Sequence, residues 1–339
     1  METRRKKNTT SYKYLGDTIT NDNKNKRNLE IRENKTQGTI IQINTTASSD
    51  IMRGIETKVL LKLYETSIVS SLVHNAESWT LSLSEETQID MIGIKAIKRL
   101  FSLPTTTPSA AVLFNLGLLY ITQVVDKMRF SFLHKILNRP CDHWTKQMLK
   151  HLQSLGIGWA KNIQEKLNEY ELETDWEKIN RKSKALWKKE VEEAVDKRNQ
   201  KKLVEKCTTV TKDGIKIHTK SKTIHAKLMS PDYKRQPVKE LIQGTRQRTK
   251  TLILARHGIL ECGTNRKGTI PEKCRNCNVV DDESHRMNVC RTFSHLNLTN
   301  RENAPFPMCT QKTNQPLMES LKILGVTYYR LALDCLSEY

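Results

Sequence analysis

Residues 60–72 read LLKLYETSIVSSL, a segment in which apolar side chains recur at every fourth position: Leu60, Tyr64, Ile68 and Leu72. Residues three or four positions apart share one face of an α-helix, so this spacing predicts a helix with a continuous apolar face. Leu61 and Val69 widen that face. We therefore expect this helix to pack against a core.

The flanking segments continue the helical pattern. Ser84, followed by Glu85 and Glu86, is expected to cap a helix whose buried face comprises Ile89, Ile92, Ala96 and Leu100. A short helix over residues 109–116 should end at Gly117, because glycine readily adopts the left-handed conformation that closes a helix. A longer helix before Pro140 carries apolar residues at helical spacing: Val124, Val125, Met128, Phe132, Leu133 and Ile136. Residues 25–140 are therefore predicted to form a compact helical bundle.

The N-terminal residues 1–24 have a different pattern. Ser11 to Gly16 alternate aromatic and polar residues, which indicates one short strand followed by a turn through residues 21–25. The sequence offers no strand partner nearby, and a lone strand is marginal in water. We expect this strand to pair with a segment outside the chain.

Residues 141–237 are expected to form amphipathic helices and a basic linker. Four tryptophans lie among dense lysines and glutamates: Trp144, Trp159, Trp176 and Trp187. At helical spacing they are expected to be core residues rather than platforms for nucleic-acid bases. Residues 238–255 should form a further basic helix ending at Gly258, and Leu317, Leu321, Leu324 and Leu331 indicate a C-terminal helix within 311–339.

The charge balance restricts the class of partner. The 339 residues include 57 Lys and Arg against 37 Asp and Glu, a formal net charge of +20. Residues 197–256 hold 17 Lys and Arg against 4 acids. Such an excess is typical of proteins that bind nucleic acid, whether RNA, DNA or a hybrid. No apolar run has membrane-spanning length, and the basic N-terminal residues are followed by polar residues instead of the apolar stretch of a signal sequence. We therefore predict an intracellular protein of the nucleus or cytoplasm, neither secreted nor bound to a membrane.

One cluster has the spacing of a metal site. Cys274 and Cys277 are separated by two residues, His285 follows after seven more, and Cys290 after a further four. Three thiolates and one imidazole are the ligands of a closed, tetrahedral structural zinc site. Two alternatives stay open: one ligand is replaced by Cys262, His295 or Cys309, or the cysteines are unrelated thiols.

Cationic residues surround this predicted zinc knuckle and the helix before it, within residues 238–310. We predict that they contact nucleic-acid phosphates: Arg246, Arg248, Lys250, Arg256, Arg266, Lys267, Lys273, Arg275, Arg286 and Arg291. The adjacent carboxylates Asp281 and Asp282 are expected to belong to a solvated turn between the metal ligands. No catalytic residue is predicted.

Two blocks resemble a known family. The first block is similar to the segment that follows the palm in reverse transcriptases of non-LTR, LINE-type retrotransposons. It comprises Tyr14-Leu15-Gly16, residues 72–79 (LVHNAESW), Arg99-Leu100 to Pro104, and Gly117. Those proteins commonly read Tyr-Gly-Ala-Glu-x-Trp where this chain has His74-Asn75-Ala76-Glu77-Ser78-Trp79. The Cys-Cys-His-Cys cluster, preceded by Gln247-Arg248 and residues 255–258, resembles the element near their C-terminus. The likeness covers residues 11–137 and 240–300.

The resemblance implies a helical thumb that holds a template-primer duplex, with residues 1–24 at the junction between palm and thumb. The aromatic-x-Asp-Asp turn of the polymerase active site is missing, because Val280 precedes Asp281-Asp282 without an aromatic residue at the required offset. The chain is thus expected to be the C-terminal part of such a polymerase, without its palm. We predict a mainly α protein that binds RNA or an RNA:DNA duplex. The alternatives are an accessory chain that acts with a separate palm, or a non-functional remnant.

Overall fold

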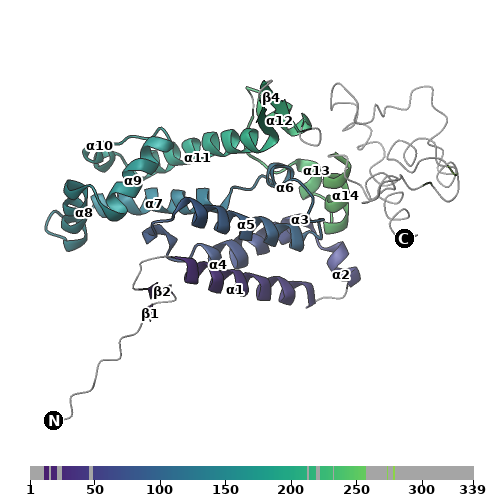
Figure 1. Ribbon diagram of the computed structural model, residues 1–339, viewed down its shortest axis with the longest axis horizontal. Helices are drawn as coiled ribbons and strands as arrows, with labels where there is room; N and C mark the ends of the chain where they lie inside the picture. The colour runs from purple at the N-terminus through teal and green to yellow at the C-terminus, as the bar shows by residue number, and fades with distance from the viewer. Residues whose placement is uncertain are drawn as a thin grey trace, which may run out of the picture.

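The computed structural model describes residues 11–14, 17–20, 25–45, 49–211, 214–218, 222–231 and 233–256, together with Lys273 and Asn278. This part is mostly helical, as predicted, and it carries two small two-stranded sheets. Figure 1 shows the helices stacked lengthwise, with α8 and α10 at one end and α13 and α14 at the other. The predicted zinc knuckle and the predicted C-terminal helix lie outside the described residues.

The N-terminal strand has a partner within the chain, so the expectation that no strand partner lies nearby is wrong. β1 (Ser11–Tyr14) and β2 (Asp17–Thr20) form an antiparallel hairpin in which Tyr12 lies opposite Ile19. The hairpin rests on α1 (Lys26–Thr45), where the Asn28 side chain bonds both the N–H and the carbonyl of Thr18. The sequence pattern hid β2 because Asp17–Thr20 has no run of large apolar residues.

The predicted helix over residues 60–72 is present. α2 (Ser49–Gly54) precedes α3 (Thr57–Leu63), which continues through a π-helical segment, η1 (Tyr64–Val69), into α4 (Ser70–Leu72). All four residues of the apolar stripe are buried: Leu60, Tyr64, Ile68 and Leu72. An apolar spacing of four drifts by about 40° per repeat on an α-helix with 3.6 residues per turn. The wider π turn offsets that drift and keeps the stripe on one face.

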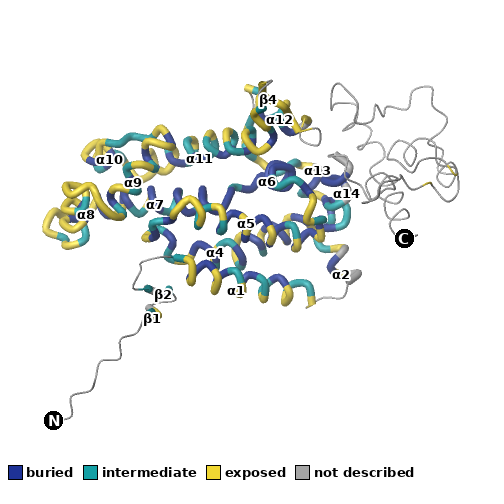
Figure 2. The backbone as a smooth tube through the Cα atoms, viewed as in Figure 1, coloured by how far each residue is buried: buried dark blue, intermediate teal, exposed yellow. Residues whose placement is uncertain are grey.

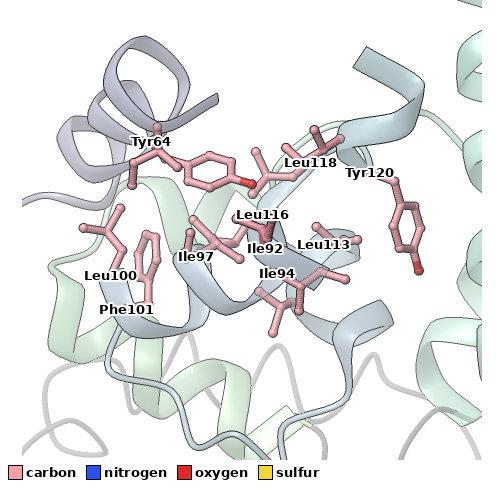
Figure 3. Close-up of a cluster of buried hydrophobic side chains, with 14 of the residues drawn as sticks. Tyr64, Ile92, Ile94, Ile97, Leu100, Phe101, Leu113, Leu116, Leu118 and Tyr120 are labelled. Carbon is pink, nitrogen blue, oxygen red and sulfur yellow. The ribbon is translucent and has the colours of Figure 1, made fainter. Parts of the chain in front are cut away.

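A first core forms where this helix meets the next three. After η2 (Ala76–Ser78) come α5 (Leu83–Leu100), α6 (Ser109–Leu116) and α7 (Ile121–Leu137). Figure 3 shows Tyr64 directed into the cluster of Ile92, Ile97, Leu100, Leu113 and Leu116. Gly93 allows the close approach of α5 and α7, since a Cβ there would lie 2.4 Å from Ile121 Cγ1. Figure 2 shows that α6 is almost completely buried.

A second core is built around the other half of α7. α8 (Trp144–Leu155), α9 (Gly158–Glu169), α10 (Trp176–Arg181) and the long α11 (Lys184–Cys207) surround it. Phe130 and Leu133 from α7 pack there with Leu167, Trp176 and Trp187. The predicted boundary between residues 140 and 141 therefore runs through a shared core. Trp159, Trp176 and Trp187 contribute to that core as expected, whereas Trp144 is 69% exposed.

The remaining elements return to the first core. β3 (Thr208–Thr211) and β4 (Gly214–Ile217) form an antiparallel hairpin, followed by α12 (Lys222–Leu228), α13 (Lys239–Ile242) and α14 (Arg246–Arg256). Leu241, Leu252, Ile253 and Leu254 are buried against the first bundle. Residues 238–255 are thus two short helices instead of one, because the chain turns at Gly244.

Helix ends follow local chemistry with one correction. The cap of α5 is Ser82 rather than Ser84, because Ser82 and Glu85 form a reciprocal capping box in which each side chain accepts from the other's backbone N–H. Gly117 ends α6 in the left-handed conformation, as predicted.

Among the described residues, no single helix has the length and apolar composition to cross a bilayer. α6 and α7 meet that test only together, across a 54° bend.

Candidate nucleic-acid interface

Backbone hydrogen bonds fix α14 to the corner between α2 and α3. Arg246 N donates to Ile55 O over 2.7 Å, and Thr57 N donates to Gly244 O over 2.9 Å. Between these two bonds lies an isolated bridge that joins Glu56 and Thr245. The start of the predicted basic helix is therefore held rigidly against the first bundle.

Arg246, the first predicted phosphate contact, makes its side-chain hydrogen bonds inside the fold. Its side chain is largely buried, and Nη2 donates to Ser102 Oγ over 2.8 Å and to Asn44 Oδ1 over 3.0 Å. A longer bond of 3.4 Å reaches the carbonyl of Arg99. Burial lowers the pKa of the Arg246 guanidinium, but arginine stays charged in proteins. Its three partners carry no negative charge, so this buried cation is solvated by neutral oxygens alone.

The other predicted contacts fall into two groups. Arg248 and Lys250 are half-buried on α14, Arg256 is the last residue of that helix, and Lys273 is exposed. Five predicted contacts lie outside the described residues: Arg266, Lys267, Arg275, Arg286 and Arg291. Arg246, Arg248 and Lys250 therefore come together on α14, and the structure gives no geometry for the second group.

The predicted zinc ligands also lie outside the described part of the chain: Cys274, Cys277, His285 and Cys290. So do the alternative ligands Cys262, His295 and Cys309. Within the described residues, no group of three His, Cys, Asp or Glu side chains is placed to hold a metal ion. The case for zinc thus depends on the chemistry and spacing of the donor set.

An open groove with a volume of about 550 Å³ lies beside Arg246, between the C-terminal halves of α1 and α5. Its walls combine polar and apolar side chains: Gln37, Ile40, Ile41, Asn44, Arg99, Ser102, Leu103 and Pro104. Asn44 and Ser102 are also the two side chains that bond Arg246. The groove therefore joins three segments that are far apart in the sequence.

The segments that meet at this groove contain no acid. Residues 34–45, 91–107 and 246–256 include lysines and arginines but neither Asp nor Glu. Within the described part of the chain, Arg99, Arg248 and Lys250 make no ion pair, and the nearby Glu56 pairs with Lys58 over 2.8 Å. Lys98 donates to Thr105 O, and burial lowers the pKa of its amine. Arg99, Arg248 and Lys250 are therefore cations without an ion pair among the described residues, whereas Lys95 of the same α5 segment pairs with Glu33 at 3.4 Å.

The segment that carries the family resemblance has a structural role here. The Arg32 guanidinium donates to the backbone carbonyls of Ser71, Leu72 and His74. It also forms an ion pair with Asp17 at 2.6 Å and lies 4.6 Å from the centroid of the Trp79 ring. The carbonyls of Glu77 and Trp79 accept bonds from Trp159 Nε1 and Arg129 Nη2, respectively. These bonds satisfy the carbonyls of an irregular turn that would otherwise be left unpaired.

Two buried carboxylates lie away from the groove, and both hold helices together. Asp126 pairs with Arg129 at 3.0 Å and accepts from the Tyr170 hydroxyl, while burial raises the pKa of its carboxyl. Asp90 accepts from the N–H and hydroxyl of Thr122 and pairs with Lys202 at 2.7 Å. The oxygens of both carboxylates are already paired in contacts that link helices, which is the arrangement of a structural network.

Sequence reasoning missed most of the groove. Gln37, Asn44, Arg99 and Ser102 have ordinary sequence surroundings, and only the absence of acids from their segments hints at a shared role. No family model matches this chain, and comparisons with known proteins and with solved structures gave no match either.

Proposed function

We propose that this protein binds RNA or an RNA:DNA duplex through the phosphate backbone, without reading the base sequence. The observation that supports this is a set of cations without an ion pair among the described residues, Arg99 at the end of α5 and Arg248 and Lys250 on α14, in segments that contain no acid. Unneutralised lysines and arginines at such a surface release counterions from a polyanion when they bind it, which is the main source of affinity for a phosphate backbone.

The chain resembles the thumb and Cys-Cys-His-Cys region of a retrotransposon reverse transcriptase, and the proposal follows that likeness. α14 leads from the first bundle directly towards the predicted zinc ligands in the sequence. Cys274, Cys277, His285 and Cys290 would hold a zinc ion whose four protein ligands leave no position for a reacting water. The metal would fold a small module that carries Lys273, Arg275 and Arg286.

The salt dependence of binding tests the proposal. Fluorescence anisotropy with a labelled 20-nucleotide RNA, and with the matching RNA:DNA hybrid, should give an affinity that falls linearly with salt on a log–log scale. Each neutralised phosphate contributes a slope of about −0.7 on a single strand and about −0.9 on a duplex. An affinity independent of salt would contradict a phosphate-based mode.

A pair of double variants localises the binding. Arg248→Gln with Lys250→Gln removes two charges from α14, and Lys184→Gln with Lys188→Gln removes two from the exposed surface of α11. We expect the α14 pair to weaken binding several-fold more than the α11 pair. Equal effects would show that net charge alone attracts the nucleic acid.

The N-terminal strand had suggested an accessory role beside a separate polymerase palm, but this strand pairs with β2 within the chain. We expect no primer extension by the purified chain with magnesium and nucleotides, because the chain lacks the aromatic-x-Asp-Asp turn. A non-functional remnant would bind no RNA and would melt without cooperativity.

A further inference from the structure

A buried cation lies behind the wall of the groove between α1 and α5. Asn44 and Ser102, which line it, both accept from Arg246 Nη2, so the guanidinium lies directly behind these two side chains. Arg246 Nε is buried and has no hydrogen-bond partner among the described residues. A buried cation with neutral partners alone costs stability, and an anion in the groove would offset part of that cost by charge attraction.

A second cation lies on the groove wall. Arg99 is exposed, lines the groove and makes no ion pair within the described part of the chain. Gln37 and Asn44 add neutral amide groups, while Ile40, Ile41 and Pro104 form an apolar side. Two guanidiniums with amides and no carboxylate favour a phosphate, and the apolar side suits a sugar or base next to it.

The backbone at Ser102 supports a binding role. Ser102 has a φ of 50° and closes α5 in a Schellman motif, in which Leu103 N donates to Lys98 O and Ser102 N to Arg99 O. Gly117 and Gly156 occupy the same position in equivalent motifs. A serine is strained in this left-handed conformation, whereas glycine is not. The Ser102 hydroxyl, however, accepts from Arg246, which a glycine could not do.

We propose that this groove binds one phosphodiester group of the nucleic-acid strand, with Arg99 and Arg246 providing the positive charge. Asn44 and Ser102 hold the Arg246 guanidinium directly behind the groove wall, and the aliphatic residues contact the neighbouring nucleoside. This site rests on the proposed function, because it defines where one phosphate of the same ligand binds.

Asn44→Asp separates binding from folding. The new carboxylate would face Arg246 and neutralise it within the protein, which offsets the penalty of an acid near the C-terminus of α1. The fold should therefore keep its Tm, while the phosphate loses its cation. Asn34→Asp is the matched control, because Asn34 is exposed on the same helix, changes the net charge equally and does not line the groove.

The measurement is anisotropy with a 12-nucleotide single-stranded RNA from 50 to 300 mM salt. We expect Asn44→Asp and Arg99→Gln each to lower the affinity about tenfold at low salt, and to reduce the magnitude of the log–log slope by about 0.7, the contribution of one phosphate on a single strand. Asn34→Asp should leave the slope unchanged.

A second pair of variants tests the strained position. Ser102→Gly relieves the backbone strain but removes a hydrogen bond to the buried Arg246 guanidinium, so it should not raise the Tm, while it weakens RNA binding. Glu171→Gly is its control: Glu171 has a φ of 56° in the same kind of motif, and its exposed pair with Lys197 is worth little. This control relieves the same strain and loses only an exposed ion pair, so it should raise the Tm slightly without weakening binding.

The outcomes separate the two proposals. If the wild-type protein binds RNA with a steep salt dependence but Asn44→Asp and Arg99→Gln behave like Asn34→Asp, the groove is not the phosphate site and the broader function stands. If the wild-type protein binds no RNA at any salt concentration, both proposals fail together.

Discussion

The hydroxyls of Thr57 and Thr249 lie 2.6 Å apart in the protein interior, although 192 positions separate them in the sequence. Thr249 also donates to the carbonyl of Leu241 over 3.0 Å. A hydroxyl has one proton to give, so Thr57 is the donor in the pair. This chain of hydrogen bonds joins α3, α14 and α13, and it fixes the helix that carries Arg246.

Thr249→Val should therefore cost more stability than Thr57→Val. The first change leaves the buried Thr57 hydroxyl without its acceptor and removes the side-chain bond to the Leu241 carbonyl, which still accepts from Gly244 N; we expect it to lower the free energy of unfolding by about 2 kcal/mol. The second removes only a donor to Thr249 and should cost about 1 kcal/mol. Urea denaturation measures both, and the double variant should lose less than the sum; strict additivity would show that the two hydroxyls do not interact.

Position 75 should accept glycine but reject a β-branched residue. Asn75 has a φ of 57°, a conformation that glycine adopts freely and asparagine tolerates better than other residues. The retrotransposon polymerases that the chain resembles commonly have glycine there. We expect Asn75→Gly to change stability by less than about 1 kcal/mol and Asn75→Val to lose about 2 kcal/mol. Asn34→Val, at an exposed position of α1, is the control and should stay close to wild type.

Metal analysis should find one zinc ion per chain, bound by the Cys-Cys-His-Cys cluster. Cys277→Ser removes a thiolate and should abolish stoichiometric zinc, whereas Cys141→Ser, which changes an exposed free cysteine, should retain it. Inductively coupled plasma mass spectrometry of the purified variants gives the answer. A well-folded wild-type protein without zinc would rule out this site.

The carboxylate of Glu169 should make the fold sensitive to acid. Burial alone would raise its pKa, but hydrogen bonds and charge interactions with Lys166 and Arg198 outweigh burial and lower it. A lowered pKa means that the native state binds the proton less well than the unfolded chain does. The stabilisation is therefore present above about pH 4.5 and is lost as the pH falls further.

Denaturation at pH 6 and pH 3.5 tests this assignment. Glu169→Gln should lose less stability between the two pH values than the wild type does. Glu165→Gln is the control on the same helix, where the carboxylate is exposed and 4.0 Å from Lys161. Burial raises the pKa of the nearby Asp126, which acts in the opposite direction, so the comparison between variants is more informative than the wild-type curve alone.

Periodicity identified most of the helices, because one face of each must be apolar. The stripe from Leu60 to Leu72 and the end of α6 at Gly117 were both predicted and are present. The prediction failed where a partner decides the structure. β2 pairs with β1 through backbone groups that no side-chain pattern encodes. The Ser82 cap, by contrast, has the Ser-x-x-Glu spacing of a capping box, which the choice of Ser84 overlooked.

The groove could not be predicted for the same reason. Asn44 and Arg246 are 202 positions apart, and Ser102 and Arg246 are 144 apart. Sequence reasoning selected Arg246 for its charge, but it could not show that neutral oxygens from two other helices surround the guanidinium. The predicted zinc ligands lie outside the described residues, so zinc binding stays a prediction.

The position of α7 limits how this protein can be divided. Its first half, with Ile121 and Val125, belongs to the first core, and its second half, with Phe130 and Leu133, belongs to the second. A fragment that ended near residue 140 would expose the apolar face of α7 that packs in the second core. Such an exposed apolar patch favours aggregation. Deletion mapping of RNA contacts should therefore cut outside the span from α1 to α14, and shorter pieces would report on solubility instead of recognition.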